Sequence, residues 1–311
     1  MNYSKQYISQ LGEETNFINS IVEKVVRLLD VLDFVFTKSS FSSDVALKGG
    51  TAINLIHTNL KRLSVDIDLD YQGSLDKEKA FLDKEKITNE LDEYMTNEGY
   101  SVSSKSRGSV ALFSRMYQYT NAFGNIDYIK VEINFLDRVY VYPSTIEVLN
   151  KFDKTIKIRT PLKEELYGMK ICALIDRSKP RDLYDVDYLF YNFSTMDKDK
   201  LRKSVVFYLS LDGIFNIDDS TYKGIEAISH SDIKKELLPV LQKGEWFDLE
   251  QSTSFVLNKL KELLHLSKKE EMYLADFKKG NYNPSLLFEG SLSERIDAHP
   301  MAKWRIKNIS W

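Results

Sequence analysis

Cysteine is nearly absent from this sequence, and the single Cys172 has no partner for an internal disulfide. The same scarcity excludes a cysteine-rich zinc site and is typical of a cytosolic chain. The four histidines do not show the spacing of metal ligands; they are His57, His230, His265 and His299. A metal centre built on cysteine or histidine is therefore not expected.

Long apolar runs are also missing, and no secretory segment is evident. We therefore expect a soluble, cytoplasmic protein with no membrane partner. A net charge of −3, from 43 Lys and Arg against 46 Asp and Glu, excludes a uniformly basic nucleic-acid-binding protein. It still permits a local basic groove. The 311 residues contain no evident repeat and are enough for two domains.

The most informative stretch begins at the motif Lys48-Gly49-Gly50-Thr51. The apolar residues 45–47 before it are typical of a short strand. The two glycines let the backbone turn sharply and approach a ligand closely. Apolar residues then recur at helical spacing, so a helix should begin near Thr51 with its free N–H groups beside the glycines. Such a helix end attracts phosphate, although a glycine pair by itself also fits an ordinary turn.

A second strand is predicted over residues 63–71, and it carries Asp66 and Asp68 two positions apart. Both carboxylates therefore leave the same face, while Ile67 and Leu69 point into the core. Carboxylates held side by side repel one another unless a cation lies between them. Mg²⁺ prefers such oxygen ligands and also binds substrate phosphates. The alternative interpretation is a solvated strand face.

The remaining pattern predicts an α+β protein. Amphipathic spacing indicates a helix over residues 3–37 and one or two helices over 77–97. Residues 101–119 and 127–136 are predicted as strands joined by a turn that contains Gly124. From about residue 196 the pattern is mostly helical.

Glu132 belongs to the alternating part of the strand over 127–136, with Lys130 and Asn134 on the same side. If that strand lies beside the strand of Asp66 and Asp68, Glu132 would complete a site of three carboxylates. The alternative is a half-exposed strand with an ordinary polar face.

A second informative segment runs from Arg159 to Leu189. Thr160 as the cap and Pro161 as the first helical residue predict the start of a helix. Lys170 and Arg177, seven residues apart, then lie on one side of it.

Pro180 ends this helix, and a second one should begin around residue 181 or 182. Asp182 and Asp185 are three residues apart and share a face of the second helix. In the alternative interpretation, Lys170 is a surface lysine and Asp182 only interacts with the helix dipole, while Arg177 pairs with these acids.

Both segments resemble the AbiEii/AbiGii toxin family, which belongs to the polymerase-beta-like nucleotidyltransferases. The first segment shows the glycine motif followed by Arg62-x-Ser64-x-Asp66-x-Asp68, and the second shows K-x-x-A-L-x-x-R followed by R-D-L-Y-D. The resemblance covers residues 40–190 well and the rest weakly. It implies a nucleotidyltransferase-like mixed β-sheet core with flanking helices over residues 1–155. A mainly helical domain over 156–311 would contribute Lys170 and Asp182 or Asp185 to the cleft.

The resemblance also implies roles for individual residues. Asp66, Asp68 and Glu132 would bind Mg²⁺, and Lys170 would act on the nucleotide phosphates. Either Asp182 or Asp185 would be the supporting catalytic acid; which of the two is open. The implied nucleotide-binding residues are Lys48, Gly49, Gly50, Thr51, Arg62, Ser64, Lys170 and Arg177.

The implied function is that of a toxin in a bacterial toxin–antitoxin and abortive-infection system, which gives phage resistance. The enzyme would be a magnesium-dependent nucleotidyltransferase that moves a nucleotide from GTP or a pyrimidine NTP to an RNA, such as the 3′ end of tRNA. Its cognate antitoxin would be a separately encoded DNA-binding repressor. Two other functions are open: a GTP-binding regulatory protein without turnover, and a nucleotidyltransferase that acts on a small molecule.

Overall fold

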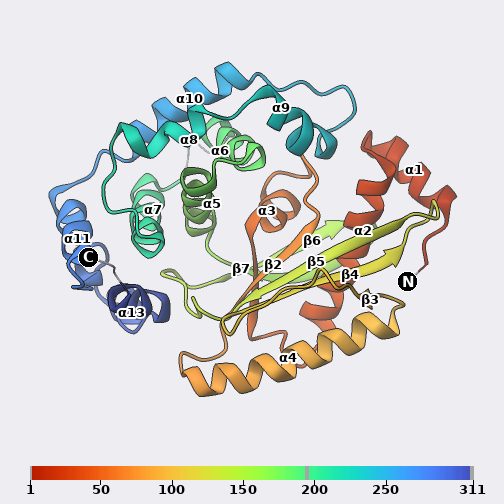
Figure 1. The fold of residues 1–311 in the computed structure, drawn as a ribbon, viewed down its shortest axis with the longest axis horizontal. Helices are drawn as coiled ribbons and strands as arrows, with labels where there is room; N and C mark the ends of the chain where they lie inside the picture. The colour runs from red at the N-terminus through yellow and green to blue at the C-terminus, as the bar shows by residue number, and fades with distance from the viewer. Residues whose placement is uncertain (1, 193–195, 309–311) are drawn as a thin grey trace. The chain divides into compact units, whose positions relative to one another are not determined.

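The structure is a computed structural model that describes residues 2–192 and 196–308. The chain divides into two compact units that alternate along the sequence (Figure 1). The β-unit comprises Met1–Arg138, Ser144–Thr160 and Pro239–Glu245; the helical unit comprises Val139–Pro143, Pro161–Leu238 and Trp246–Trp311. The boundary expected between residues 155 and 156 lies close to the crossing at residues 160 and 161.

A five-stranded mixed sheet with the order β1-β2-β5-β4-β3 forms the core of the β-unit. Only β2 and β5 run parallel; the other neighbours are antiparallel. A separate hairpin of two strands completes the unit. The strands are β1 (Val45–Lys48), β2 (Asp66–Tyr71), β3 (Ser101–Val102), β4 (Leu112–Thr120), β5 (Ile126–Asn134), β6 (Thr145–Lys151) and β7 (Lys154–Thr160).

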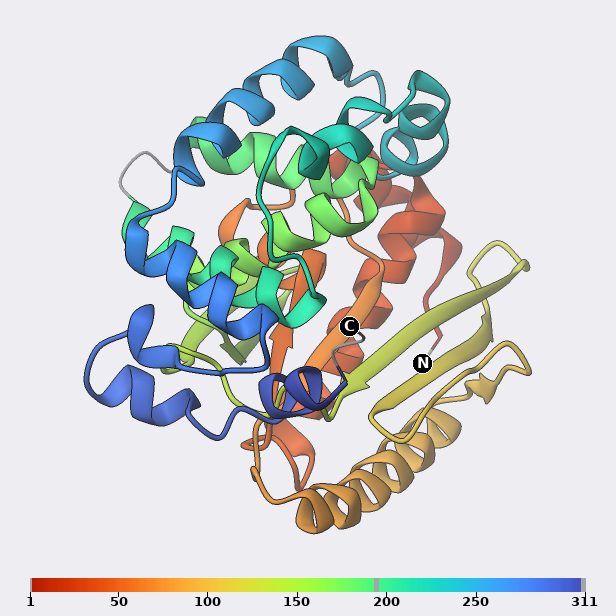
Figure 2. The ribbon, with the colours of Figure 1, turned by 60° about the vertical axis from the view of Figure 1, so that its left-hand side comes forward.

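The two faces of the sheet differ because side chains alternate along each strand. One face is apolar and packs against α2 (Asn19–Asp33) and α4 (Lys77–Asn97). On this covered face, the Tyr117 hydroxyl donates to Asp92 of α4 at 2.5 Å, and Lys24 of α2 pairs with Asp127 at 2.7 Å. The other face carries Asp66 and Asp68, and we call it the polar face. Figure 2 shows α4 running along the β4–β5 hairpin.

Two predicted elements are interrupted. The helix expected over residues 3–37 is split into α1 (Lys5–Thr15) and α2, because Asn16 takes a left-handed conformation with φ of 58° and ends α1. The π-helical segment η1 (Phe34–Lys38) continues α2 directly. The prediction of a continuous strand over residues 101–119 is wrong for its middle part. Residues 103–111 form a loop between β3 and β4. By contrast, residues 77–97 form one helix, as one of the two predicted alternatives.

A short segment from late in the sequence completes the β-unit. The Leu63 N–H donates to the Val240 carbonyl at 2.7 Å, and the Lys243 N–H donates to the Asn16 carbonyl at 2.7 Å. Backbone groups before β2 and after α1 are therefore satisfied by residues 239–245.

The helical unit confirms the predicted second domain of mainly helical character. α5 (Lys163–Arg177) packs on α6 (Pro180–Asn192) and α7 (Lys198–Asp212), and α10 packs on α6. Among the described residues, no helix has the length and apolar character needed to cross a membrane. The other helices are α8 (Lys223–Glu226), α9 (His230–Asp232), α10 (Leu249–Leu263), α11 (Lys268–Lys278), α12 (Ser291–Ile296) and α13 (Pro300–Lys307), with short turns η3 (Asp219–Tyr222), η4 (Ile233–Leu237), η5 (Leu238–Val240) and η6 (Pro284–Leu286).

The predicted start of α5 is wrong by two residues. Thr160 pairs with Thr145 as the last residue of β7, so its backbone belongs to a strand and cannot cap a helix. The helix begins at Lys163, and Leu162 precedes it without a side-chain cap.

A buried ion pair attaches α2 to the β4–β5 turn. Glu23 and Arg27, at 0% and 2% exposure, bond through Glu23 Oε1 and Arg27 Nε at 2.9 Å. The Glu23 carboxylate also accepts from the Ala122 N–H at 2.9 Å, and the Arg27 guanidinium lies 4.2 Å from the centroid of the Tyr119 ring. The pair therefore holds a helix, a strand and a turn together.

We expect Arg27→Met to destabilise the protein by about 3–5 kcal/mol, because it leaves the Glu23 carboxylate buried without its cation. Urea unfolding of the wild type and the variant measures this loss. The matched control is Lys38→Ala, which removes an exposed ion pair with Asp33 and should cost about 1 kcal/mol or less. Equal effects of the two substitutions would contradict the structural role of Arg27.

Glu165 of α5 is buried in the helical unit and fixes the segment 139–143. Its carboxylate accepts from the N–H groups of Val141 at 2.7 Å and Tyr142 at 2.9 Å, and from the Tyr208 hydroxyl at 2.7 Å. Burial raises the pKa of Glu165 from 4.5 to about 7, although the Tyr142 N–H opposes this. The folded state therefore holds a proton that the unfolded state has already lost between these two pH values.

Because the folded-state pKa of Glu165 is the higher one, stability should fall as the pH rises from about 4.5 to 7, by roughly 3 kcal/mol from this group. The Glu165→Gln variant lacks the titrating carboxyl and should show a correspondingly weaker pH dependence. Denaturant midpoints measured at several pH values test this. Parallel pH profiles for the two proteins would show that Glu165 titrates normally.

Candidate active site

The polar face of the sheet brings four predicted site residues together. The register sets Asp68 of β2 opposite Lys48 of β1 on one side and Glu132 of β5 on the other. Asp66 lies opposite Lys130 of β5. Because directly paired residues project from the same face, the side chains of all five residues share the polar face.

The electrostatics of Asp68 fit a site for a divalent cation. Burial, followed by the neighbouring carboxylates of Asp66 and Glu132, raises the pKa of Asp68 to about 6, against the opposing charge of Lys48. Like charges at this spacing are relieved by a cation, and carboxylate oxygens are the ligands that Mg²⁺ prefers.

The glycine turn approaches Asp68 closely. Gly49 has a φ of +71°, and a Cβ added there would lie 2.7 Å from Asp68 Oδ2. A Cβ on Gly50 would lie 2.7 Å from a guanidinium nitrogen of Arg62 and 3.1 Å from Ser64 Oγ. The first glycine is therefore required by its backbone conformation and by space, and the second by space. The turn continues as α3 (Gly49–Ala52) and η2 (Ile53–His57).

Thr51, Arg62 and Ser64 lie around this turn and support it. The Thr51 hydroxyl bonds to the backbone oxygen of Asp66 and lies 3.0 Å from Ser64 Oγ. Arg62 is 2% exposed and donates from Nη1 to the Leu63 carbonyl at 3.1 Å. The predicted nucleotide-binding residues of this segment thus lie around the glycine turn, where Arg62 is buried beside Gly50.

Lys48 is held by a residue that the sequence analysis missed. Its Nζ lies 2.6 Å from Asp70 Oδ1 and 3.9 Å from Asp137 Oδ2, and Asp70 is fully buried. Burial lowers the pKa of Lys48, but the charges of Asp70 and Asp137 outweigh burial and raise it above its usual range. Asp70 follows Asp68 at the same spacing of two, so this signal was present in the sequence.

Glu132 has partners of its own on the polar face. Ser114 Oγ donates to Glu132 Oε1 at 2.8 Å, and Lys130 Nζ lies 2.6 Å from Oε2. Across residues 2–192 and 196–308, no three Asp, Glu, His or Cys side chains form a group that could hold a metal ion. A cation held by Asp66 and Asp68 would therefore also need oxygen ligands from the substrate or from water.

The helical unit contains a second cluster of predicted site residues, formed by α5 and α6. Lys170, only 5% exposed, places its Nζ 2.8 Å from Asp182 Oδ1 and 3.2 Å from Asp185 Oδ2. Arg177 donates from Nε to Asp182 Oδ2 at 2.7 Å and from Nη2 to Oδ1 at 3.0 Å. The helical spacings expected from the sequence thus bring all four side chains together.

Within this cluster, Asp182 is held in its ionised form. Burial raises the pKa of Asp182, but Lys170 and Arg177 together outweigh burial and leave it well below the usual range. A carboxylate with so low a pKa is a poor proton acceptor near neutral pH. The geometry therefore favours a role for Asp182 in orienting Lys170.

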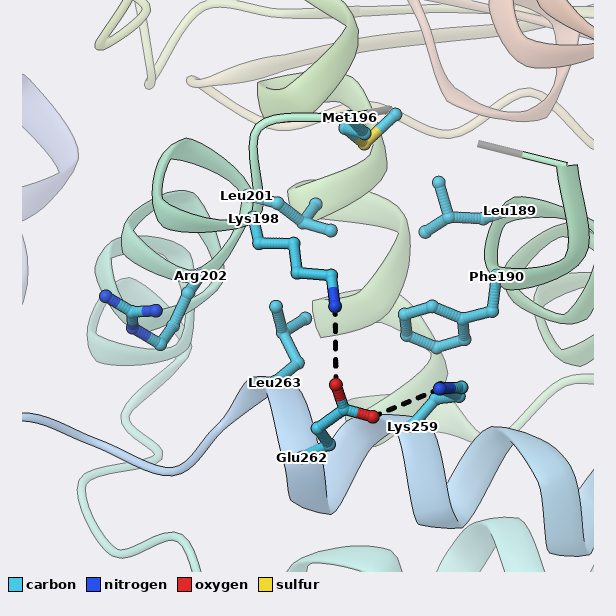
Figure 3. A pocket seen from close by; sticks show the side chains of 9 residues that line it. All are labelled: Leu189, Phe190, Met196, Lys198, Leu201, Arg202, Lys259, Glu262 and Leu263. Atoms are coloured by element: carbon cyan, nitrogen blue, oxygen red, sulfur yellow. Dashed lines mark hydrogen bonds and ion pairs between the residues drawn. The ribbon is translucent and has the colours of Figure 1, made fainter. Parts of the chain in front are cut away.

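A hollow of about 210 Å³ also lies in the helical unit, between α6, α7 and α10 (Figure 3). Leu189, Phe190 and Leu201 are among its apolar lining residues. At its rim, Lys198 and Lys259 both pair with Glu262, at 3.3 and 3.0 Å. The hollow contains none of the predicted site residues.

Comparison with known proteins gives a family and a fold for the chain. The profile of the family described as "Nucleotidyl transferase AbiEii toxin, Type IV TA system" matches residues 30–280. A search of curated proteins finds no match. Among solved structures, the chain is similar to MenT4, a nucleotidyltransferase toxin from Mycobacterium tuberculosis, with a TM-score of 0.63 and 17% identity over 88% of this chain and 94% of that one. A candidate nucleotidyltransferase from H. pylori matches with a TM-score of 0.45 and 18% identity, over 77% of this chain and 96% of that one.

The Lys48–Asp70 pair should be essential for stability. We expect Asp70→Asn to cost about 3–5 kcal/mol, because the largely buried ammonium loses its nearest carboxylate. Thermal unfolding of the single variant and of Asp70→Asn/Lys48→Met distinguishes a loss caused by the unpaired Lys48 charge from a loss of other Asp70 contacts. The double variant should recover much of the loss; an equally unstable double variant would mean that Asp70 acts through other contacts.

Proposed function

Because this chain belongs to the AbiEii family of nucleotidyltransferase toxins, we propose that it is a magnesium-dependent enzyme that transfers a nucleotide from an NTP to the 3′ end of a tRNA and thereby stops growth. The observation that carries this proposal is the Asp66–Asp68 pair, placed in register with Glu132 and against the glycine turn. The similarity in fold to MenT4, a nucleotidyltransferase toxin, is consistent with it.

In this proposal Asp66 and Asp68 hold Mg²⁺, with Glu132 as a third carboxylate beside them. When bound, the metal neutralises phosphate charge and helps to align the attacking and leaving oxygens. The backbone of Gly49 and Gly50 would contact the triphosphate, since a glycine turn lets phosphate approach the N–H groups closely. Lys48 adds a positive charge that the buried Asp70 keeps in place.

Lys170 is proposed to stabilise the charge that builds up on the phosphates. An ammonium group suits this task because it is a compact charge with no acceptor. Asp182 and Arg177 would hold Lys170 and its partners in position. Asp185 or Glu132 would then be the carboxylate that takes the proton from the attacking hydroxyl.

The wider role follows from the family. A toxin of a type IV system acts beside a separately encoded antitoxin, for which we propose a DNA-binding repressor, and its action on tRNA would halt translation during phage infection. GTP and the pyrimidine NTPs are the candidate donors. A GTP-binding regulator without turnover and a nucleotidyltransferase for a small molecule are the alternatives that the following experiment separates.

The test uses purified protein with Mg²⁺, total bacterial tRNA and each of the four labelled NTPs. We expect one NTP to label tRNA, and Asp68→Ala and Lys170→Ala each to reduce labelling at least about a hundredfold, because each removes several kcal/mol of charge stabilisation. Lys86→Ala, on an exposed position of α4, should react like the wild type.

The outcome names the function. Nucleotide binding that depends on Mg²⁺ without any labelled product would favour the regulator, and labelling of a small acceptor without an RNA product would favour the alternative enzyme. If Asp68→Ala or Lys170→Ala were still as growth-inhibitory as the parent after induction, the proposed mechanism would be wrong.

A further inference from the structure

The polar face of the sheet extends beyond the candidate metal site. The pairing of β2 with β5 begins at Asp66 and Lys130, so residues 126–129 of β5 pair with β4 and have no β2 residue beside them in the described structure. Because Tyr128 is two positions from Lys130, it projects from the polar face, about 7 Å from Lys130 along the strand. The face that carries Asp66 therefore continues toward the β4–β5 turn.

This extension presents an aromatic and apolar surface. Tyr128 lies opposite Gln118, and Lys130 lies opposite Met116; all four side chains are partly exposed. Ile126, farther along the same side of β5, is 62% exposed. The helices α2 and α4 pack on the covered face, so they do not shield these residues from solvent.

Two cations accompany the surface. Lys105, from the loop between β3 and β4, places its Nζ 4.5 Å from the centroid of the Tyr128 ring. Lys130 is 37% exposed and pairs with Glu132. A partly exposed ring with one lysine over it and another two positions along the strand is a combination that suits single-stranded nucleic acid, where bases stack on aromatic rings and cations contact the phosphates. Stacking of a base is stronger than an exposed cation–π contact, so a base would displace Lys105 from the ring and leave its charge for a phosphate.

We propose that Tyr128, Lys105 and Lys130 form a subsite for the single-stranded end of the acceptor RNA, with a base stacked on Tyr128. This inference rests on the proposed function, since it names where that reaction holds its acceptor. The position supports it: Lys130 neighbours Asp66 directly in the register, so a strand bound on Tyr128 leads to the carboxylate pair. The small-molecule alternative would leave this surface without a ligand.

The first experiment measures RNA binding without NTP, so that no turnover is needed. The probe is a short, mixed-sequence oligoribonucleotide with a fluorescent 5′ label, followed by fluorescence anisotropy. Tyr128→Ala should weaken binding about tenfold, whereas Tyr128→Phe, which keeps the ring, should stay within about twofold of the wild type. Lys105→Ala should reduce the slope of log affinity against log salt by about one, as expected for the loss of one phosphate contact.

Lys86→Ala is the matched control for charge, because Lys86 belongs to α4 on the opposite side of the sheet. It should change neither the affinity nor the salt slope by as much as Lys105→Ala. Equal effects of the two lysine variants would indicate a diffuse electrostatic contribution and would overturn the subsite.

The second experiment is the labelling reaction with the Tyr128 variants. Tyr128→Ala should raise the KM for tRNA about tenfold and leave the KM for the NTP unchanged, and Tyr128→Phe should restore the wild-type value.

If the wild type labels tRNA and Tyr128→Ala binds and reacts like it, the subsite is wrong while the proposed function stands. If no NTP is transferred at all, the proposed function fails, and the anisotropy result still decides whether this surface binds RNA. Unchanged RNA binding by Tyr128→Ala together with lost binding of the purified antitoxin would assign the surface to a protein partner instead.

Discussion

The polar face depends on the antiparallel pairing of β1 with β2. This pairing sets Lys48 opposite Asp68 and lets its ammonium reach the buried Asp70. Without that cation, β2 would present three carboxylates on one face, and each adjacent pair, about 7 Å apart, would repel by roughly 2 kcal/mol at an effective dielectric constant of 20. The Lys48–Asp70 pair relieves one end of this row, and the repulsion between Asp66 and Asp68 is what the proposed cation would relieve.

The same principle recurs in the helical unit. There Lys170 is buried between two aspartates, and Asp182 is in turn bonded by Arg177. In both units the ammonium group of a lysine is held in position by a buried carboxylate, Asp70 for Lys48 and Asp182 for Lys170. A lysine held in this way would lose little side-chain entropy in the proposed contact with a phosphate, because its position is fixed beforehand.

Regular spacing made most of the site predictable from sequence. Period two placed Asp66 and Asp68 on one face, and periods of three and seven placed Lys170, Arg177, Asp182 and Asp185 in one cluster. The membership of the family, the α+β class, the mixed sheet and the helical second unit are confirmed.

What the sequence did not reveal depends on tertiary partners. Thr160 belongs to β7 because it pairs with Thr145. Neither local propensity nor the capping rules can predict that pairing. The hydrogen bonds that Ser114 and Lys130 make to Glu132 depend on strand register, and the split at Asn16 depends on a single left-handed residue. Asp70 was within reach, because it repeats the spacing of the two acids before it.

The late segment 239–245 has a consequence for synthesis on the ribosome. Val240 and Lys243 supply carbonyl and N–H partners to Leu63 and Asn16, far earlier in the chain. The β-unit therefore cannot close these backbone hydrogen bonds until residues 239–245 have left the exit tunnel. A chain that ends before residue 239 carries the glycine turn, Asp66 and Asp68, yet lacks the segment 239–245 that pairs with the backbone around them. For a protein whose proposed activity would harm the cell that makes it, this order of assembly delays completion of the β-unit until residues 239–245 have been translated.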